Sequence, residues 1–254
     1  MMKKTRSIGM VVAVLFMVMA GSSAMAVIAG DSTLWEGAYE ADAMPAGDFV
    51  DQDGSVAAQG GSIQTDGTDS WLHMDNANAW GYAGVLATDG QGYVANANTN
   101  GGAAYEVRSR FNGGSWGNWG HLMTSATSAD GHYNWLTYYV EDGAFKINNS
   151  NSFGNENATI SMDTSEFHTY RFVNDNVNWS LYIDGSTTAA ASINVLACYD
   201  DFNAGGYDGY AGRATFYWGD TGDLDYIRYT DTVPEPATMG LLALGGLFLR
   251  RRKR

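Results

Sequence analysis

Apolar and polar residues alternate along several short stretches of this chain, and AYEVRSRF at residues 104–111 is among the clearest. An extended chain sends successive side chains to opposite faces. One face therefore receives the apolar set and the other the charged set: Tyr105, Val107 and Phe111 against Glu106, Arg108 and Arg110. The pattern predicts a strand with one buried and one wet face.

A longer alternating stretch, FHTYRFVNDNVNWSLYIDG at residues 167–185, contains two such runs. The first run alternates Phe167, Thr169, Arg171 and Val173 with His168, Tyr170 and Phe172. Residues 174–176, Asn-Asp-Asn, favour a turn. The second run places its apolar residues on one inward row, and Asp184-Gly185 ends it: Val177, Trp179, Leu181 and Ile183. We predict a β-hairpin.

Further strands are predicted where short β-prone runs are separated by Gly, Asn and Asp: 71–76, 121–127, 134–142, 143–149, 214–220 and 224–230. No convincing amphipathic helix, repeat or linker interrupts residues 27–233, and Pro45 lies outside every proposed central strand. Many short strands joined by turns favour an all-β fold, an antiparallel β-sandwich or jelly roll. We expect one domain over residues 27–232.

The order of these segments is similar to the concanavalin A-like, LamG-type jelly roll. The similarity is carried by TLWEGAYEADAMP, YEVRSRF, FHTYRFVNDNVNWSLYIDG and the closing GDLDYIRYT, and it extends over residues 33–230. The resemblance implies a concanavalin A-like sandwich. That fold is used by sugar-binding modules, adhesion domains and glycosidases, so the fold by itself does not select among them.

The N-terminus has the pattern of a secretory signal peptide, residues 1–26. Lys3, Lys4 and Arg6 precede an apolar run at 8–20, and Ala24-Met25-Ala26 fits an A-x-A cleavage site. The run is shorter than the roughly 20 residues that span a bilayer. We expect export through the Sec machinery and cleavage after Ala26, with an uncleaved N-terminal anchor as the alternative.

The C-terminus, residues 233–254, combines three parts in order. Val233-Pro234-Glu235-Pro236 comes first, an apolar stretch at 237–249 follows, and a basic cluster ends the chain: Arg250, Arg251, Arg252, Lys253 and Arg254. As a helix the apolar stretch reaches only about 20 Å. The basic residues would stop it at the cytoplasmic side, which predicts a short transmembrane helix inserted transiently.

This tail resembles the bacterial PEP-CTERM sorting signal. The resemblance implies exosortase as a partner, processing near the Pro-Glu-Pro, and delivery to the cell surface, outer envelope or extracellular matrix. A removable hydrophobic tail of this kind acts as an address rather than an anchor. A plain C-terminal anchor is the alternative.

The charge distribution excludes some partners. Residues 27–232 hold 27 of the 28 acidic residues and 6 of the 14 basic ones, which gives a formal charge of −21 against −14 for the whole chain. Such a surface repels nucleic acid, which we therefore exclude as a partner. Cys198 is the single cysteine, so no intrachain disulfide forms. The four histidines lack zinc-site spacing.

Calcium is the cofactor that the acidic loops suggest, because Ca²⁺ prefers oxygen ligands. The candidate ligands lie in two Gly-containing segments: Asp51 and Asp53, and Asp200, Asp201 and Asp208. Solvated turn acids are the alternative reading. Catalytic residues are not assigned: Glu40-x-Asp42 and Asp223-x-Asp225 lack the third acid of the Glu-x-Asp-x-x-Glu arrangement that jelly-roll glucanases carry.

Tryptophans are the remaining candidates for ligand binding, because the faces of their rings stack well on sugar rings. Trp116 and Trp119 occur in a Gly-rich segment and are the candidate ligand-binding residues, with core packing as the alternative. We therefore expect an exported surface or matrix protein, non-enzymatic, that binds polysaccharide or builds the matrix. A divergent glycoside hydrolase or lyase on the same fold is the competing hypothesis.

Overall fold

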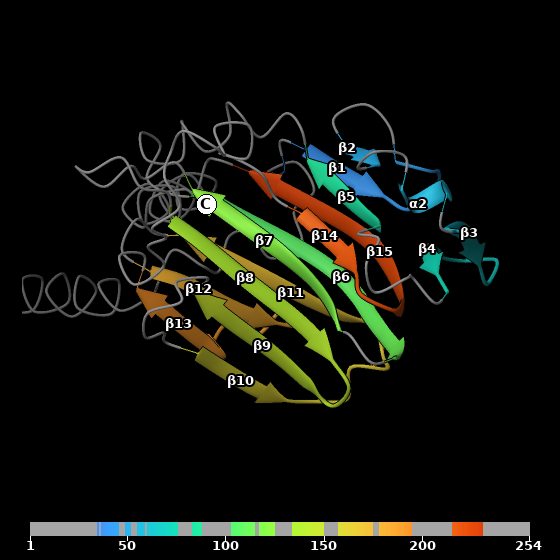
Figure 1. The fold of residues 1–254 in the computed structure, drawn as a ribbon. Helices are drawn as coiled ribbons and strands as arrows, with labels where there is room; N and C mark the ends of the chain where they lie inside the picture. The colour runs from blue at the N-terminus through green and yellow to red at the C-terminus, as the bar shows by residue number, and fades with distance from the viewer. Residues whose placement is uncertain are drawn as a thin grey trace, which may run out of the picture. The chain divides into compact units, whose positions relative to one another are not determined.

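The strands of this chain pair into two antiparallel sheets (Figure 1). The computed structural model describes residue 35 and residues 37–45, 49–51, 55–58, 60–75, 83–87, 103–114, 117–124, 134–149, 157–174, 178–194 and 215–230. All of them belong to one compact unit, Ser32–Thr232.

The eight-stranded sheet has the long strands β6 and β15 at its middle. In spatial order it contains β13 (Ala191–Asn194), β12 (Asn178–Ile183), β11 (His168–Asn174), β6 (Ala103–Gly113), β15 (Thr221–Thr230), β4 (Ser70–Met74) and β3 (Ser62–Thr65). A further strand, β1 (Gly37–Glu40), pairs with the C-terminal half of β15.

The seven-stranded sheet contains, in order, β10 (Asn157–Ser161), β9 (Ala144–Asn149), β8 (Asn134–Glu141), β7 (Asn118–Thr124), β14 (Thr215–Trp218), β5 (Ala83–Ala87) and β2 (Phe49–Asp51). One helical turn, α2 (Ser55–Ala58), lies between β2 and β3 in the chain. The chain passes from one sheet to the other repeatedly, as in a jelly roll. The predicted all-β, antiparallel sandwich is confirmed.

The two sheets pack through an aromatic core. In Figure 1, β8 and β9 of one sheet cross in front of β11 and β12 of the other. Tyr105 and Phe172 of the eight-stranded sheet contact Tyr138 of the seven-stranded sheet, with ring centroids 6.2 Å and 5.2 Å away. Phe145 stacks on Tyr170 at 4.2 Å. All five rings are fully buried, and burial of such large side chains is the main stabilising contribution of a sandwich core.

The predicted alternation is confirmed in the strands that carry it. Tyr105, Val107 and Phe111 of β6 belong to the core. Strands β11 and β12 form the predicted hairpin, with Tyr170 opposite Ile183. Trp179 and Leu181 are buried, and Ile183 packs against the core; Val177 lies outside the described residues.

Several strands were not predicted: β1, β2, β3, β5, β10 and β13. These strands have only three to five residues, and all except β2 contain Gly, Ala or Ser, which have weak β propensity. They are extended because a neighbouring strand supplies backbone partners: β5, for example, pairs with both β14 and β2.

The predicted signal peptide and C-terminal tail lie outside the described residues. Within the part of the chain that the structure describes, no helix is both long enough and apolar enough to cross a membrane.

Candidate binding site on the eight-stranded sheet

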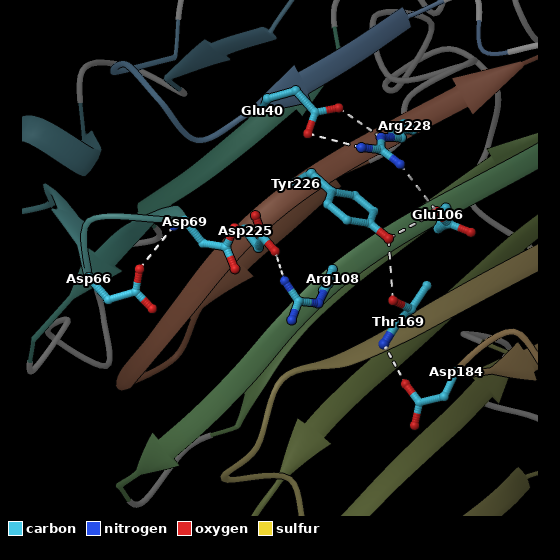
Figure 2. Close-up of polar contacts among 10 residues, drawn as sticks. All are labelled: Glu40, Asp66, Asp69, Glu106, Arg108, Thr169, Asp184, Asp225, Tyr226 and Arg228. Carbon is cyan, nitrogen blue, oxygen red and sulfur yellow. Dashed lines mark hydrogen bonds and ion pairs between the residues drawn. The ribbon is translucent and has the colours of Figure 1, made fainter. Parts of the chain in front are cut away.

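The outward side of the eight-stranded sheet carries a dense set of charged and aromatic side chains. They come from β1, β4, β6, β11 and β15 and from Phe167, the residue before β11. Figure 2 shows members of the set from β1, β6 and β15 together with Thr169 of β11. We call this set the ion-pair face: Glu40, Trp71, His73, Glu106, Arg108, Arg110, Asn112, Phe167, Thr169, Arg171, Asp223, Asp225, Tyr226 and Arg228. It follows from alternation in β6, whose opposite side builds the core.

A β-bulge in β15 sets the composition of this face. Leu224 is opposite Ser109 and Tyr226 is opposite Arg108, so Asp225 is an extra residue in the strand. Leu224 and Ile227, on either side of the bulge, are both fully buried in the core. The extra residue therefore lets β15 keep its apolar side inward while presenting polar residues at 223, 225, 226 and 228.

Asp223 is the most buried acid of the face, with 1% of its side chain exposed. It accepts hydrogen bonds from Arg110 Nε at 2.5 Å and from Asn112 Nδ2 at 2.9 Å. His73 Nδ1 lies 2.5 Å from its other oxygen. A buried carboxylate needs such partners because its desolvation is costly when they are missing. The three contacts come from β6 and β4, so Asp223 ties both neighbours to β15.

Two aromatic rings lie beside this cluster. Trp71 and Phe167 meet edge to face, with centroids 6.0 Å apart. The Arg110 guanidinium lies 5.4 Å from the centroid of Trp71 and 4.5 Å from that of Phe167, and Arg108 lies 4.9 Å from Phe167. Both rings are partly exposed. The cation–π contacts hold the rings and guanidinium groups in fixed relative positions.

Glu106 organises the other end of the face. Its carboxylate accepts a hydrogen bond from Arg171 Nε at 2.7 Å. It accepts another from the Tyr226 hydroxyl at 3.1 Å, which Figure 2 shows. Arg228 lies 3.8 Å away and donates two further hydrogen bonds to Glu40, at 2.7 and 3.0 Å. Burial, together with the negative charge of Glu106, raises the pKa of Tyr226 to about 12. Tyr226 is therefore a neutral donor at physiological pH.

Asp225 lies between the two clusters and forms an ion pair with Arg108. Burial raises the pKa of Asp225 above its ordinary value, and the nearby charges of Asp69 and Glu40 act in the same direction. Arg108 opposes this shift without cancelling it. Asp69, which is in the turn between β3 and β4, lies beside Asp225 (Figure 2).

Only two of the sequence-predicted site residues are among the residues that the structure describes, and neither belongs to the ion-pair face. Trp119 lies in β7 of the seven-stranded sheet, and Asp51 is the last residue of β2. The other candidates lie outside the described residues: Ala24, Ala26, Asp53, Trp116, Asp200, Asp201, Asp208, Val233–Pro236 and Arg250–Arg254. Among the described residues, no cluster of three or more His, Cys, Asp or Glu could hold a metal ion.

Sequence reasoning missed the ion-pair face, although one signal pointed to it. The side of AYEVRSRF predicted to be wet carries three charges on a strand that proved central, and one of them, Glu106, is only 3% exposed. Such charges need partners from neighbouring strands. The side chains that hydrogen-bond these three charges lie 65 to 120 residues away in the chain, and only the fold brings them together.

The comparisons with known proteins identify the tail. Residues 232–254 match the family model of the PEP-CTERM protein-sorting motif, so the predicted sorting signal is confirmed. The motif marks the chain for export and exosortase sorting, to the cell surface or the extracellular space. No curated protein gives a significant match to the sequence.

Solved structures give weak likenesses to the body. A carbohydrate esterase of the Shiga toxin-encoding bacteriophage phi24B has 12% identity and a TM-score of 0.49, with 76% of this chain and 98% of that chain covered. Botulinum neurotoxin type C, which interacts with two ganglioside molecules, has 12% identity and a TM-score of 0.43. The binding domain of botulinum neurotoxin DC, in complex with SialylT, has 13% and 0.42. For both neurotoxins, 72% of this chain and 44% of the other is covered. The fold of this chain rests on its own strand topology.

Proposed function

We propose that this exported protein is non-enzymatic and binds polysaccharide through the ion-pair face of its jelly-roll domain. The observation that carries the proposal is the partly exposed pair of rings, Trp71 and Phe167, beside the Arg110 guanidinium. Next to this group, Asn112 donates a hydrogen bond to Asp223. The exosortase signal supports the proposal, because a protein sorted to the cell surface or the extracellular space can meet extracellular polysaccharide.

The chemistry of sugar recognition supports this assignment. A sugar ring has apolar C–H faces and a rim of hydroxyl groups, so its binding site combines aromatic rings with a few fixed polar groups. Trp71 and Phe167 supply the rings, and the guanidinium groups of Arg108 and Arg110 supply donors. A guanidinium carries five N–H donors, and the contact that Arg110 makes to Asp223 uses Nε.

A second function, glycoside hydrolysis or lyase chemistry, is favoured by one observation at Asp225. A general acid must hold its proton near neutral pH, and burial raises the pKa of this carboxyl. Arg108, paired with Asp225, has the opposite effect. The other acids of the face, Glu40, Glu106 and Asp223, are each paired with arginine, which suits positioning better than proton transfer.

The experiment combines a glycan array with a reducing-sugar release assay on the purified full chain. We expect binding without turnover, lost in Trp71→Ala and kept in Trp116→Ala and Trp119→Ala. Binding that depends on Trp116 or Trp119 instead would move the site to the Gly-rich segment at 112–120. Turnover that Asp225→Asn abolishes would establish the hydrolase or lyase.

The ends of the chain belong to the same proposal. The signal peptide at 1–26, Sec export, and transient membrane insertion of 237–249 before exosortase acts at Val233–Pro236 together give a mature domain of residues 27–232. The intact mass of the protein isolated from its native envelope tests both cleavage sites. A mass that retains residues 1–26 or 237–254 would contradict the corresponding step.

Calcium is proposed for the two acidic segments, with Asp51 and Asp53 in one and Asp200, Asp201 and Asp208 in the other. A structural ion stabilises the folded state by mass action. Thermal unfolding of the full chain should then shift to lower temperature when a chelator is added and return when Ca²⁺ is restored. An unchanged midpoint would leave these acids as solvated turn residues.

A further inference from the structure

The basic residues of this acidic domain are concentrated on the ion-pair face. Four of the six basic residues between 27 and 232 lie there: Arg108, Arg110, Arg171 and Arg228. Each forms an ion pair with a different acid of the face: Asp225, Asp223, Glu106 and Glu40, respectively. With His73 counted as neutral, the formal charges of these pairs cancel, within a span whose net charge is −21.

The carboxylate partners of two arginines cannot be displaced into water. Asp223, paired with Arg110, has 1% of its side chain exposed, and Glu106, paired with Arg171, has 4%. An anionic sugar that captured either arginine would leave a buried carboxylate without its counter-charge, which is strongly unfavourable. The charges of Arg110 and Arg171 therefore stay paired with the protein's own acids.

Exposed carboxylates at the margins of the ion-pair face also disfavour the binding of anions. Asp66 and Asp69 lie at one end and Asp184 lies at the other (Figure 2). All three are exposed. A uronate or sulfate group approaching the face would meet these carboxylates and the acidic field of the whole domain. A hydroxyl group, which both donates and accepts hydrogen bonds, meets no such barrier.

We propose that the ligand of the ion-pair face is an uncharged polysaccharide, lying along β15; this inference rests on the polysaccharide-binding function proposed above. Asp223, beside Trp71 and Phe167, is opposite Arg110, and Arg228 is opposite Glu106, four residues along β6. The two positions are therefore about 13 Å apart along the strand at roughly 3.3 Å per residue. At its far end the Arg228 guanidinium lies 3.9 Å from the centroid of the Tyr226 ring. Both ends thus carry an aromatic ring with a guanidinium against it, and the length between them suits a chain rather than a single sugar.

The test is affinity electrophoresis of the purified full chain in gels that contain one polysaccharide each. Dextran, galactomannan and mixed-linkage β-glucan are the uncharged probes, and alginate and dextran sulfate are the anionic probes. We expect retardation by at least one uncharged polysaccharide, with little dependence on NaCl. Ionic contacts would weaken with salt, whereas ring stacking and neutral hydrogen bonds do not.

Variants locate the binding. Trp71→Ala should weaken it by about tenfold or more, since loss of one stacked ring and its buried area costs on the order of 1.4 kcal/mol, a factor of ten. Trp71→Phe should retain part of the affinity and guards against misfolding of the alanine variant. Lys146→Ala, on β9 of the other sheet and paired with Glu141, is the matched control and should bind normally.

The outcomes distinguish the proposal of an uncharged ligand from the proposal that the protein binds polysaccharide at all. Salt-sensitive retardation by alginate or dextran sulfate alone would overturn the uncharged ligand and leave polysaccharide binding in place. Retardation by an uncharged polysaccharide that Trp71→Ala does not change would overturn the assignment to this face. A chain that no polysaccharide retards, uncharged or anionic, would overturn the proposed function itself.

Discussion

The Glu106–Arg171 pair offers a quantitative test of how the ion-pair face is held together. Glu106→Gln keeps the shape of the side chain and removes its charge. Arg171 has 9% of its side chain exposed, so its charge would remain buried with a neutral partner. Breaking a buried pair by removing one partner costs about 3–5 kcal/mol, and because glutamine keeps one acceptor oxygen we expect about 3 kcal/mol.

Glu40→Gln is the matched control, because Glu40 and Glu106 both lie within 4.0 Å of Arg228. The Glu40 side chain is 49% exposed, and exposed pairs contribute roughly 0–1 kcal/mol. Urea unfolding followed by tryptophan fluorescence measures both variants. For a domain of this size, Glu106→Gln should also lower Tm by about 6–12 °C, at 2–4 °C per kcal/mol.

A second variant isolates the buried charge as the cause. Glu106→Gln combined with Arg171→Met removes both charges and leaves an apolar side chain of similar length, so it should lose less stability than Glu106→Gln alone. Equal losses in Glu106→Gln and Glu40→Gln, or a double variant less stable than the single one, would refute the reasoning.

Three further predictions follow from local environments. The raised pKa of Asp225 means that the folded state favours the protonated carboxyl over the ionised one. The stabilising contribution of the protonated Asp225 is present at low pH and is lost as pH rises through the folded pKa. At pH 7, Asp225→Asn should therefore unfold at a urea midpoint no lower than that of the wild type. The pKa of Tyr226, about 12, lies above the ordinary 10.0, so stability should fall between pH 10 and 12, and Tyr226→Phe should reduce the fall in a pH series of urea melts. Gly37→Ala would place a Cβ 2.3 Å from Cε1 of the Tyr229 ring, whose residue is 3% exposed, so we expect a loss of about 1–3 kcal/mol by thermal unfolding, and an unchanged Tm would contradict the packing of β1 on β15.

The sequence predicted the sandwich because its strongest patterns lie in strands with one buried side. In β6 and the β11–β12 hairpin, large apolar residues occupy every second position, so the period of two is visible without knowledge of the partners. Short strands such as β13, Ala191–Asn194, carry one strongly buried apolar residue, Ile193, and no visible period. Their conformation is fixed by pairing, which a single sequence does not display.

The candidate site was less predictable than the fold, for a different reason. Trp116 and Trp119 attracted attention as tryptophans among glycines, whereas Trp71 is in a strand and has the sequence surroundings of a core residue. Its partner Phe167 is 96 positions away, and the guanidinium beside both rings comes from β6. Which face of a strand meets solvent, and which distant side chains share that face, depend on sheet order.

The bulge at Asp225 shows how one residue controls the composition of the face. Strict alternation from Asp223 would place Asp225 and Ile227 outward and turn Tyr226 and Arg228 toward the core. The structure has Ile227 buried and Arg228 paired with Glu40. Deletion of Asp225 should restore regular alternation with every remaining side chain on its present side, so the variant should fold cooperatively. Deletion of Ile227 is the control, because it would shift Arg228 into the core, and burying an unpaired charge is far more costly. Urea unfolding of the two deletion variants tests this prediction. If deletion of Asp225 lowers the free energy of unfolding as much as deletion of Ile227, the fold requires the bulged backbone itself and not only the correct alternation of side chains.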